Sequence, residues 1–182
     1  MVMPALLTSM SMCFSRTTPS RAIAAQFGAE ELSSAEKKIA EDIFRVLVKD
    51  VEVRVREALS VHLKTSPDLP RDVAMALARD VDSVALPMLK FSEVLTDEDL
   101  VEIVNTHGST KQVAIAQRSR VSSKVADALI DTGNETAVAK LVANEGADIT
   151  KTSLDRVMTE YKESAAVSSS LARRPCRTPP PR

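Results

Sequence analysis

Few residues of this chain have the types and spacing that catalysis or metal binding requires. The two histidines, His62 and His107, are far apart in the sequence, and no cysteine or pair of carboxylates flanks either of them. A zinc site combines several such ligands. Each histidine stands near the expected end of a helix, where the helix dipole favours a cation. We therefore expect capping roles for both histidines, and neither a metal ion nor another cofactor.

Acidic residues gather in one place, at Asp97, Glu98 and Asp99, and such a cluster invites comparison with a divalent-cation site. Consecutive residues of one helical turn point in different directions, however, and no second acidic cluster has a spacing that would place it opposite. The same residues suit the first turn of a helix, because the positive end of the helix dipole favours negative charge. The sequence predicts a charged helix start here.

Motifs of nucleophilic and phosphate chemistry are also missing from the sequence. Serine and threonine are plentiful, but none lies in the Gly-x-Ser-x-Gly pattern of a hydrolase nucleophile. The chain has four glycines and no Gly-rich phosphate loop. We therefore predict that this protein is not an enzyme.

The composition favours an all-α protein with one domain of ordinary size. Of 182 residues 44% are apolar, but four are Phe, one is Tyr and none is Trp, so the core must be aliphatic. Residues 30–163 hold 18 basic and all 25 acidic residues, a balance of −7 that argues against a broad duplex-DNA footprint. No apolar run reaches the ~20 residues of a membrane helix. Two cysteines, Cys13 and Cys176, make no disulfide framework, which favours a cytoplasmic protein.

A pattern of helix starts recurs along the middle of the chain. Thr96, Ser122 and Thr150 each precede apolar residues at offsets of four, seven and eight, which form one face of a helix. A hydroxyl group at these positions suits the N-cap, because its oxygen accepts a hydrogen bond from an unpaired N–H group. Pro70 takes the same place one unit earlier. The apolar residues are Ala74, Leu77, Ala78, Leu100, Ile103, Val104, Ala126, Leu129, Ile130, Leu154, Val157 and Met158.

A second, shorter helix follows in each unit. Its expected N-caps are Asp80, Ser109 and Asn134. Gly108 and Gly133 are expected to end the preceding helices, because glycine adopts the left-handed conformation at a helix end. Helix pairs of this kind bury their apolar faces only by stacking on their neighbours. The sequence therefore predicts an all-α fold, an α-solenoid of stacked antiparallel helix pairs in a right-handed superhelix. A compact bundle without repeats is the alternative.

The limits of this array are also marked in the sequence. Ser33 and Glu36 predict a capping box that opens a first helix pair, and a last helix is expected at about 150–163. The first pair should span about 34–48 and 51–64. The expected parts of the chain are residues 1–29, a disordered or targeting leader; 30–164, the repeat domain; and 165–182, a disordered, basic, Pro-rich tail.

Two long runs carry a family resemblance. The segments DVAMALARDVDSVALPMLKFSEVLTDEDLVEIV and QVAIAQRSRVSSKVADALIDTGNETAVAKLVAN resemble a bacterial family of uncharacterised proteins built from HEAT-like helical repeats. The similarity covers roughly residues 35–160. The resemblance implies an α-solenoid and a cytoplasmic bacterial protein, and it supplies no catalytic residues. The chain departs from the family's usual longer members by ending soon after the repeats in SSSLARRPCRTPPPR.

The second helices offer a candidate surface for a partner. In helical solenoids such helices commonly line the concave face, where partners bind. Leu86 and Ile115 recur at comparable places on one side of them, with Lys111, Arg118 and Lys140 beside them. An apolar line with a basic rim suits a helix or short linear peptide of an acidic partner. We predict a non-catalytic protein–protein interaction scaffold or adaptor that uses these residues; the alternative is that they are ordinary core.

A second hypothesis is nucleic-acid binding or base excision, because some HEAT-like proteins excise alkylated bases with an acidic residue. Asp72, Asp80 and Asp82 would be the candidates here. Such enzymes need a strongly basic groove and aromatic side chains that hold the flipped base, and an acidic body without Trp provides neither. We therefore expect capping and surface roles for these residues, a protein partner in preference to nucleic acid, and no membrane span. Self-association through an uncapped end of the array is a separate hypothesis.

Overall fold

The computed structural model describes residues 33–173, and over this range the chain is all-α, as the sequence predicts. Ten helices and no strand are found in the described range, with one isolated β-bridge between Val121 and Ala147. None of the described helices is long and apolar enough to cross a membrane. The helices are α2 (Ser34–Leu47), α3 (Val53–Leu63), α4 (Arg71–Arg79), α5 (Asp82–Phe91), α6 (Asp97–Thr106), α7 (Ser109–Ala116), α8 (Ser123–Asp131), α9 (Glu135–Ala143), α10 (Lys151–Glu160) and α11 (Ala165–Arg173).

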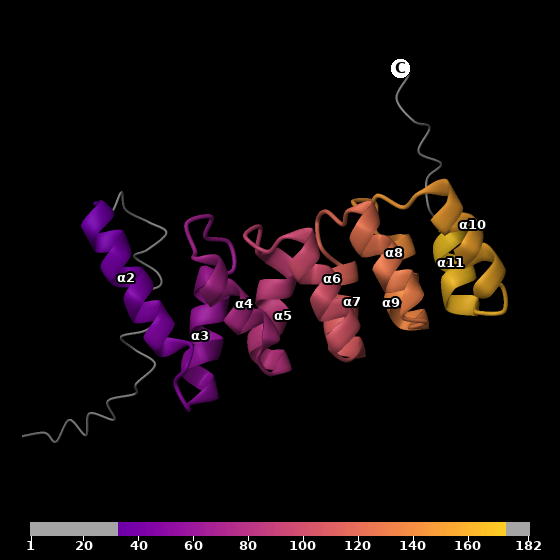
Figure 1. Cartoon of the computed structure of the whole chain (residues 1–182). Coiled ribbons are helices and arrows are strands. Elements are labelled where there is room, and N and C mark those ends of the chain that lie inside the picture. Colours follow the sequence, from indigo (N-terminus) through magenta and orange to yellow (C-terminus); the bar gives the residue numbers. More distant parts are fainter. Residues whose placement is uncertain (1–32, 174–182) are drawn as a thin grey trace, which may run out of the picture.

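The helices stand side by side in chain order, from α2 at one end to α10 and α11 at the other (Figure 1). One row consists of α3, α5, α7, α9 and α11, and each of these helices packs against the next. A second row contains α6, α8 and α10, which also pack in order, and α4 packs against α5. Each inner helix therefore has neighbours on several sides and buries more than one face.

The helices of the second row begin where the sequence predicts. The side chains of Thr96, Ser122 and Thr150 accept hydrogen bonds from backbone N–H groups in the first turns of α6, α8 and α10. Pro70 stands at the N-cap position of α4, and the predicted capping box at Ser33 opens α2. These caps satisfy N–H groups that a helix cannot pair internally.

The starts of the other row agree less closely. Asn134 caps α9 as predicted, with its Oδ1 accepting from two backbone N–H groups of the first turn. For α5 the predicted N-cap, Asp80, is one residue too early, because the N-cap is Val81. For α7 the predicted N-cap, Ser109, is one residue too late, because the N-cap is Gly108. Asp80 instead ends α4, where its carboxylate is held by an arginine from α3.

The two glycines predicted to end helices behave differently. Gly133 has φ of 72°, so it provides the left-handed turn after α8 that a side chain would strain. Gly108 has φ of −71°, in the extended region, so the prediction of a left-handed stop there is wrong. His107 already leaves the helical conformation at the end of α6, with φ of −120° and ψ of 164°. The helix therefore ends without a left-handed residue at Gly108.

The predicted apolar face is buried in three of the four units. All nine predicted residues from Ala74 to Ile130 are in the core, whereas in α10 only Val157 is fully buried. Leu154 is half-buried, and the prediction for Met158 is wrong because its side chain is 56% exposed. Among the described helices, α10 is the last of its row, so no following helix covers its outer side.

The C-terminal limit of the ordered chain lies further on than predicted. Residues 165–173 form α11, which packs on α9 and buries Val167, so the expected tail does not begin at 165. The predicted leader at 1–29, both cysteines and the Pro-rich end beyond 173 lie outside the described residues.

Candidate interaction surfaces

The apolar anchor predicted at Ile115 is not on the surface. Its side chain is fully buried in the core of α7, together with Ala114 and Ala116. Because α7 packs against both α5 and α9, the side of the helix that the sequence assigned to a partner faces a neighbouring helix instead. The prediction of Ile115 as an accessible contact is therefore wrong.

Lys111, the first predicted basic contact, is also inside the protein. The residue is only 5% exposed, and its Nζ donates to the backbone oxygen of Asp80 at 2.6 Å and to that of Ala78 at 3.3 Å. These carbonyls stand at the end of α4, where a helix leaves its last acceptors unpaired. Burial lowers the pKa of Lys111. Lys111 thus closes α4 from the next unit and does not select a partner.

Arg118 performs the same task for α5. Its Nη1 donates to the backbone oxygen of Leu89 and its Nη2 to that of Ser92, both at 2.6 Å. Its Nε is buried without a hydrogen-bond partner among the described residues, and burial lowers the pKa of the guanidinium. The guanidinium of the half-buried Arg118 thus mainly closes α5, and its partner role stays a prediction.

Asn144 repeats this arrangement one unit later, and sequence reasoning missed it. Its Nδ2 donates to the backbone oxygens of Ala116 at 2.8 Å and Arg118 at 2.7 Å, which end α7. Arg118 lies 26 residues after Ser92, and Asn144 lies 26 residues after Arg118. That separation equals the distance between the caps Thr96 and Ser122. The sequence therefore did contain a signal for these contacts: polar residues 26 positions apart, at Ser92, Arg118 and Asn144, each directly or nearly directly after a shorter helix.

Three of the five predicted contact residues, Leu86, Arg118 and Lys140, stay wholly or partly accessible. Leu86 is half-buried against the core of α5, and Lys140 is exposed on α9. A partner-binding role for these three residues stays a prediction. Together they no longer form the apolar line with a basic rim, because Lys111 and Ile115 are buried.

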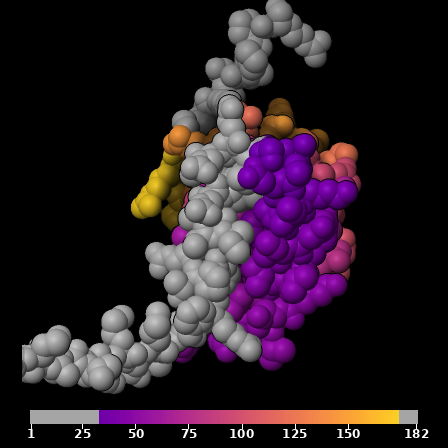
Figure 2. Space-filling model, turned by 90° about the vertical axis from the view of Figure 1, so that its left-hand side faces the viewer, coloured from indigo at the N-terminus to yellow at the C-terminus, as the bar shows by residue number. Residues whose placement is uncertain are grey.

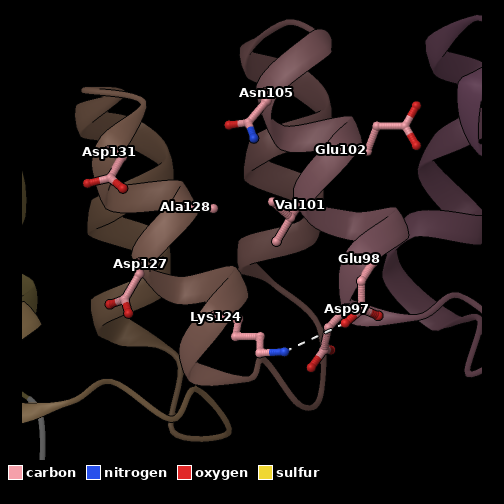
Figure 3. A pocket seen from close by; sticks show the side chains of 9 residues that line it. All are labelled: Asp97, Glu98, Val101, Glu102, Asn105, Lys124, Asp127, Ala128 and Asp131. Carbon is pink, nitrogen blue, oxygen red and sulfur yellow. Dashed lines mark ion pairs between the residues drawn. The ribbon is translucent and has the colours of Figure 1, made fainter.

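A groove lies between α6 and α8 of the other row. Its volume is about 610 Å³, and Val101 and Ala128 face one another across it while charged side chains form its two walls (Figure 3). Both apolar residues are half-buried and stay accessible. The lining residues are Asp97, Glu98, Val101, Glu102, Asn105, Lys124, Asp127, Ala128 and Asp131.

The walls of this groove are acidic, although neighbouring cations contact several of the carboxylates. Lys124 pairs with Glu98 across the groove at 3.6 Å, and both side chains are more than 70% exposed. A hydrogen bond from its own backbone N–H and the charge of Lys124 lower the pKa of Glu98. From outside the groove, Arg79 reaches Glu102 and Arg156 reaches Asp131. These pairs lie at the surface, where such interactions are weak and exchangeable.

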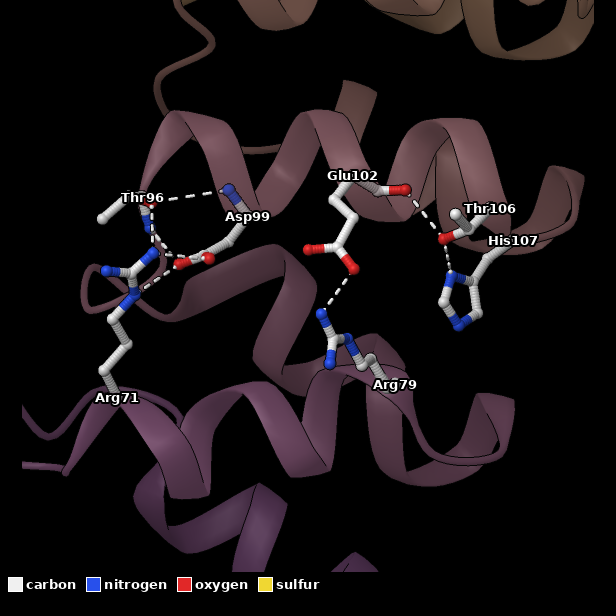
Figure 4. A network of polar contacts seen from close by, with 7 residues as sticks. All are labelled: Arg71, Arg79, Thr96, Asp99, Glu102, Thr106 and His107. Carbon is white, nitrogen blue, oxygen red and sulfur yellow. Dashed lines mark hydrogen bonds and ion pairs between the residues drawn. The ribbon is translucent and has the colours of Figure 1, made fainter.

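Contacts from α4 fix the α6 wall of the groove (Figure 4). Arg71 donates to both carboxylate oxygens of Asp99, at 2.9 Å from Nε and 2.7 Å from Nη2. The Asp99 carboxylate also accepts from the backbone N–H of Thr96 at 3.1 Å, and the guanidinium is the main cause of its lowered pKa. The predicted role of Asp97, Glu98 and Asp99 as a charged first helical turn is confirmed.

The other candidate residues of the described range lie apart from one another and take structural contacts. Within residues 33–173, no group of three or more His, Cys, Asp or Glu side chains is arranged to hold a metal ion. His62 lies in the last turn of α3, and His107 follows α6 with its Nδ1 2.7 Å from the Oγ1 of Thr106. Asp72 pairs with Arg45, and Asp80 with Arg56. Both acidic residues thus connect neighbouring helices.

The α2 end of the array is a further exposed surface. In the space-filling view of Figure 2 the indigo helices form one end of the molecule. Ala40 and Phe44 anchor α2 to the core, while Ile39 and Val46 on the same helix are 61% and 70% exposed. Self-association through an end of the array, which the sequence suggested, stays a prediction.

One comparison with known proteins gives a match. A family model described as "Uncharacterised protein conserved in bacteria (DUF2336)" matches residues 84–180, slightly more than half of the chain. The resemblance to an uncharacterised bacterial family is thus confirmed, although the description does not mention HEAT-like repeats. The match extends to residue 180 and so includes most of the Pro-rich end. No curated protein and no solved structure matches the chain.

Proposed function

We propose that this chain, which belongs to the bacterial family of uncharacterised proteins matched over residues 84–180, is a non-catalytic protein–protein interaction scaffold. The proposed architecture is a short, right-handed α-solenoid of HEAT-like helix pairs in the cytoplasm. Two rows of helices that pack in chain order support it, as do side chains that close the helix ends of the preceding unit at a fixed spacing. A preformed, repetitive surface is what such arrays offer to partners.

The groove between α6 and α8 is the proposed binding surface. The observation that carries this choice is its composition: two accessible apolar residues, Val101 and Ala128, lie between walls of charged side chains. An apolar centre with a polar rim is the usual anatomy of a protein interface. The surface predicted from the sequence, on α5, α7 and α9, is less well supported because Lys111 and Ile115 are buried and Arg118 donates to backbone carbonyls.

The same observations count against nucleic-acid binding or base excision. Phosphate groups are bound by clustered, accessible Lys and Arg side chains. Here Lys111 and Arg118 donate to backbone carbonyls, and the groove between α6 and α8 is lined by five carboxylates and one lysine. A protein partner is therefore the better supported ligand class.

Site-specific photo-crosslinking tests this proposal. A photoreactive amino acid is placed at Asn105, which lines the groove, or at Thr136, which is exposed on α9 in the other row. We expect a discrete protein adduct from Asn105 in bacterial cells and none from Thr136. The captured protein, once purified, should bind the intact chain directly. Adducts of the same protein from both positions, or from Thr136 alone, would show that the groove is not the binding surface.

A further inference from the structure

We infer that the partner of the groove between α6 and α8 is a basic amphipathic helix; this inference rests on the proposed interaction function. The groove would take one face of such a helix, with an apolar ridge against Val101 and Ala128 and Lys or Arg side chains on either side. Three features of the groove support this partner: the excess of its charge, the spacing of its carboxylates, and the kind of backbone that forms its walls.

The charge of the groove calls for a cationic partner. Five carboxylates line it, and three cations, Lys124, Arg79 and Arg156, contact them, so two negative charges are in excess. The Lys124 pair is the only one of the three that spans the groove, and it is long and largely exposed. Exposed pairs of this kind contribute little to stability, so the cations of a partner can replace Lys124 at little cost.

The spacing of the carboxylates matches that of a helix. Glu98 and Glu102 are four residues apart on α6, and Asp127 and Asp131 are four residues apart on α8. Four residues of a helix rise about 6 Å. Basic side chains placed four residues apart on a bound helix would have the same rise and meet successive carboxylates. Each wall therefore repeats at the period of a helical ligand lying along the groove.

The walls also disfavour an extended peptide. An added strand needs an exposed strand edge whose N–H and C=O groups are unpaired, whereas α6 and α8 pair their backbone groups internally. A helix laid into a groove through its side chains needs no such edge. The helices of the walls are 10 and 9 residues long, about 15 Å, so two or three turns of a ligand fit. A small interface of this kind suits a weak, transient complex.

Three synthetic peptides of equal length test the inference against the full chain by fluorescence anisotropy at near-physiological salt. The first is a Leu-based amphipathic helix flanked by Lys and Arg, the second has the same Leu pattern flanked by Glu, and the third has the composition of the first in scrambled order. We expect the first peptide to bind at least about tenfold more tightly than either of the others, because it alone combines matching charge with an apolar ridge.

Matched variants locate the binding. Ala128→Arg fills the groove and adds a positive charge, whereas Ala143→Arg makes the same change at an exposed alanine on α9. We expect loss of binding only from the first. If Ala128→Arg does not fold by circular dichroism, the double change Glu98→Gln and Glu102→Gln serves in its place. Its expected effect is a loss of about tenfold, against none for Glu57→Gln with Asp82→Asn at exposed carboxylates elsewhere.

The outcomes separate this inference from the proposed function. Equal binding of the first and third peptides would mean charge attraction alone and would overturn the inference, as would preference for the acidic peptide or binding by none. The photo-crosslinking result stands independently of these titrations. Capture at Asn105 of a protein without a basic helix would refute the partner class and leave the scaffold in place.

Discussion

The link between Arg71 and Asp99 gives the sharpest test of how the units are held together. The Asp99 side chain is only 8% exposed and accepts three hydrogen bonds, two from Arg71 on α4 and one from the backbone of Thr96. In Asp99→Asn the side chain keeps one oxygen but turns an amide toward the guanidinium. Two of the three bonds are therefore lost or weakened.

The expected cost follows from these bonds. Each lost hydrogen bond costs about 1 kcal/mol; the charge of the pair increases this cost, and the exposure of Arg71 reduces it. We therefore expect the free energy of unfolding to fall by about 2 kcal/mol. For a domain of this size that corresponds to a fall in Tm of about 8 °C. Urea unfolding followed by circular dichroism near neutral pH measures the change, and Asp155→Asn at an exposed carboxylate on α10 is the control.

The pH dependence supplies an independent check. The pKa of Asp99 is lowered below its ordinary value of 3.8, so the folded state favours its charged form. The stabilisation is therefore fully present above pH 3.8 and is lost as the pH falls through the lowered pKa. The difference between the parent chain and Asp99→Asn should shrink over this range. A difference below about 0.5 kcal/mol at neutral pH, or one that does not change on acidification, would refute the reasoning.

Three further predictions concern the interior. In Gly146→Ala the new Cβ would lie 1.9 Å from the backbone oxygen of Ser119, so the loop must shift. The free energy of unfolding, measured by urea titration, should fall by about 1–3 kcal/mol. An unchanged urea midpoint would contradict this contact. Asn144→Ala removes the donor for two carbonyls that end α7. We expect the free energy of unfolding to fall by about 2–3 kcal/mol, which thermal unfolding would show as a lower Tm. An unchanged Tm would mean that water replaces the amide. Ile115→Asp should abolish the cooperative thermal transition, because it buries an unpaired carboxylate. The control Lys140→Glu, at an exposed position, should change the free energy of unfolding by no more than about 0.5 kcal/mol. Similar effects of the two changes would show that Ile115 is not internal.

The sequence alone determined where the helices of the α6, α8 and α10 row begin and which faces of α6 and α8 are buried. The signals at these helices are local. A hydroxyl at the N-cap needs only the backbone of its own first turn, as at Thr96 and Ser122, and an apolar residue such as Leu129 is buried whichever helix covers it. The predicted starts of α5 and α7, at Asp80 and Ser109, were each misplaced by one residue. A side-chain cap was expected, whereas the N-caps Val81 and Gly108 have no side-chain cap hydrogen bond.

Only the tertiary structure decided which polar residues are inside and where the concave surface lies. Lys111 and Arg118 were read as surface cations by their polarity, but their partners are carbonyls 26 to 33 residues earlier in the chain. For Lys111, nothing in the helical pattern records that α4 ends at that point in space with unpaired acceptors. Ile115 is internal for the same reason, since α7 has a neighbour on both sides. The groove between α6 and α8 likewise exists only because two helices that are separated in sequence by α7 pack side by side.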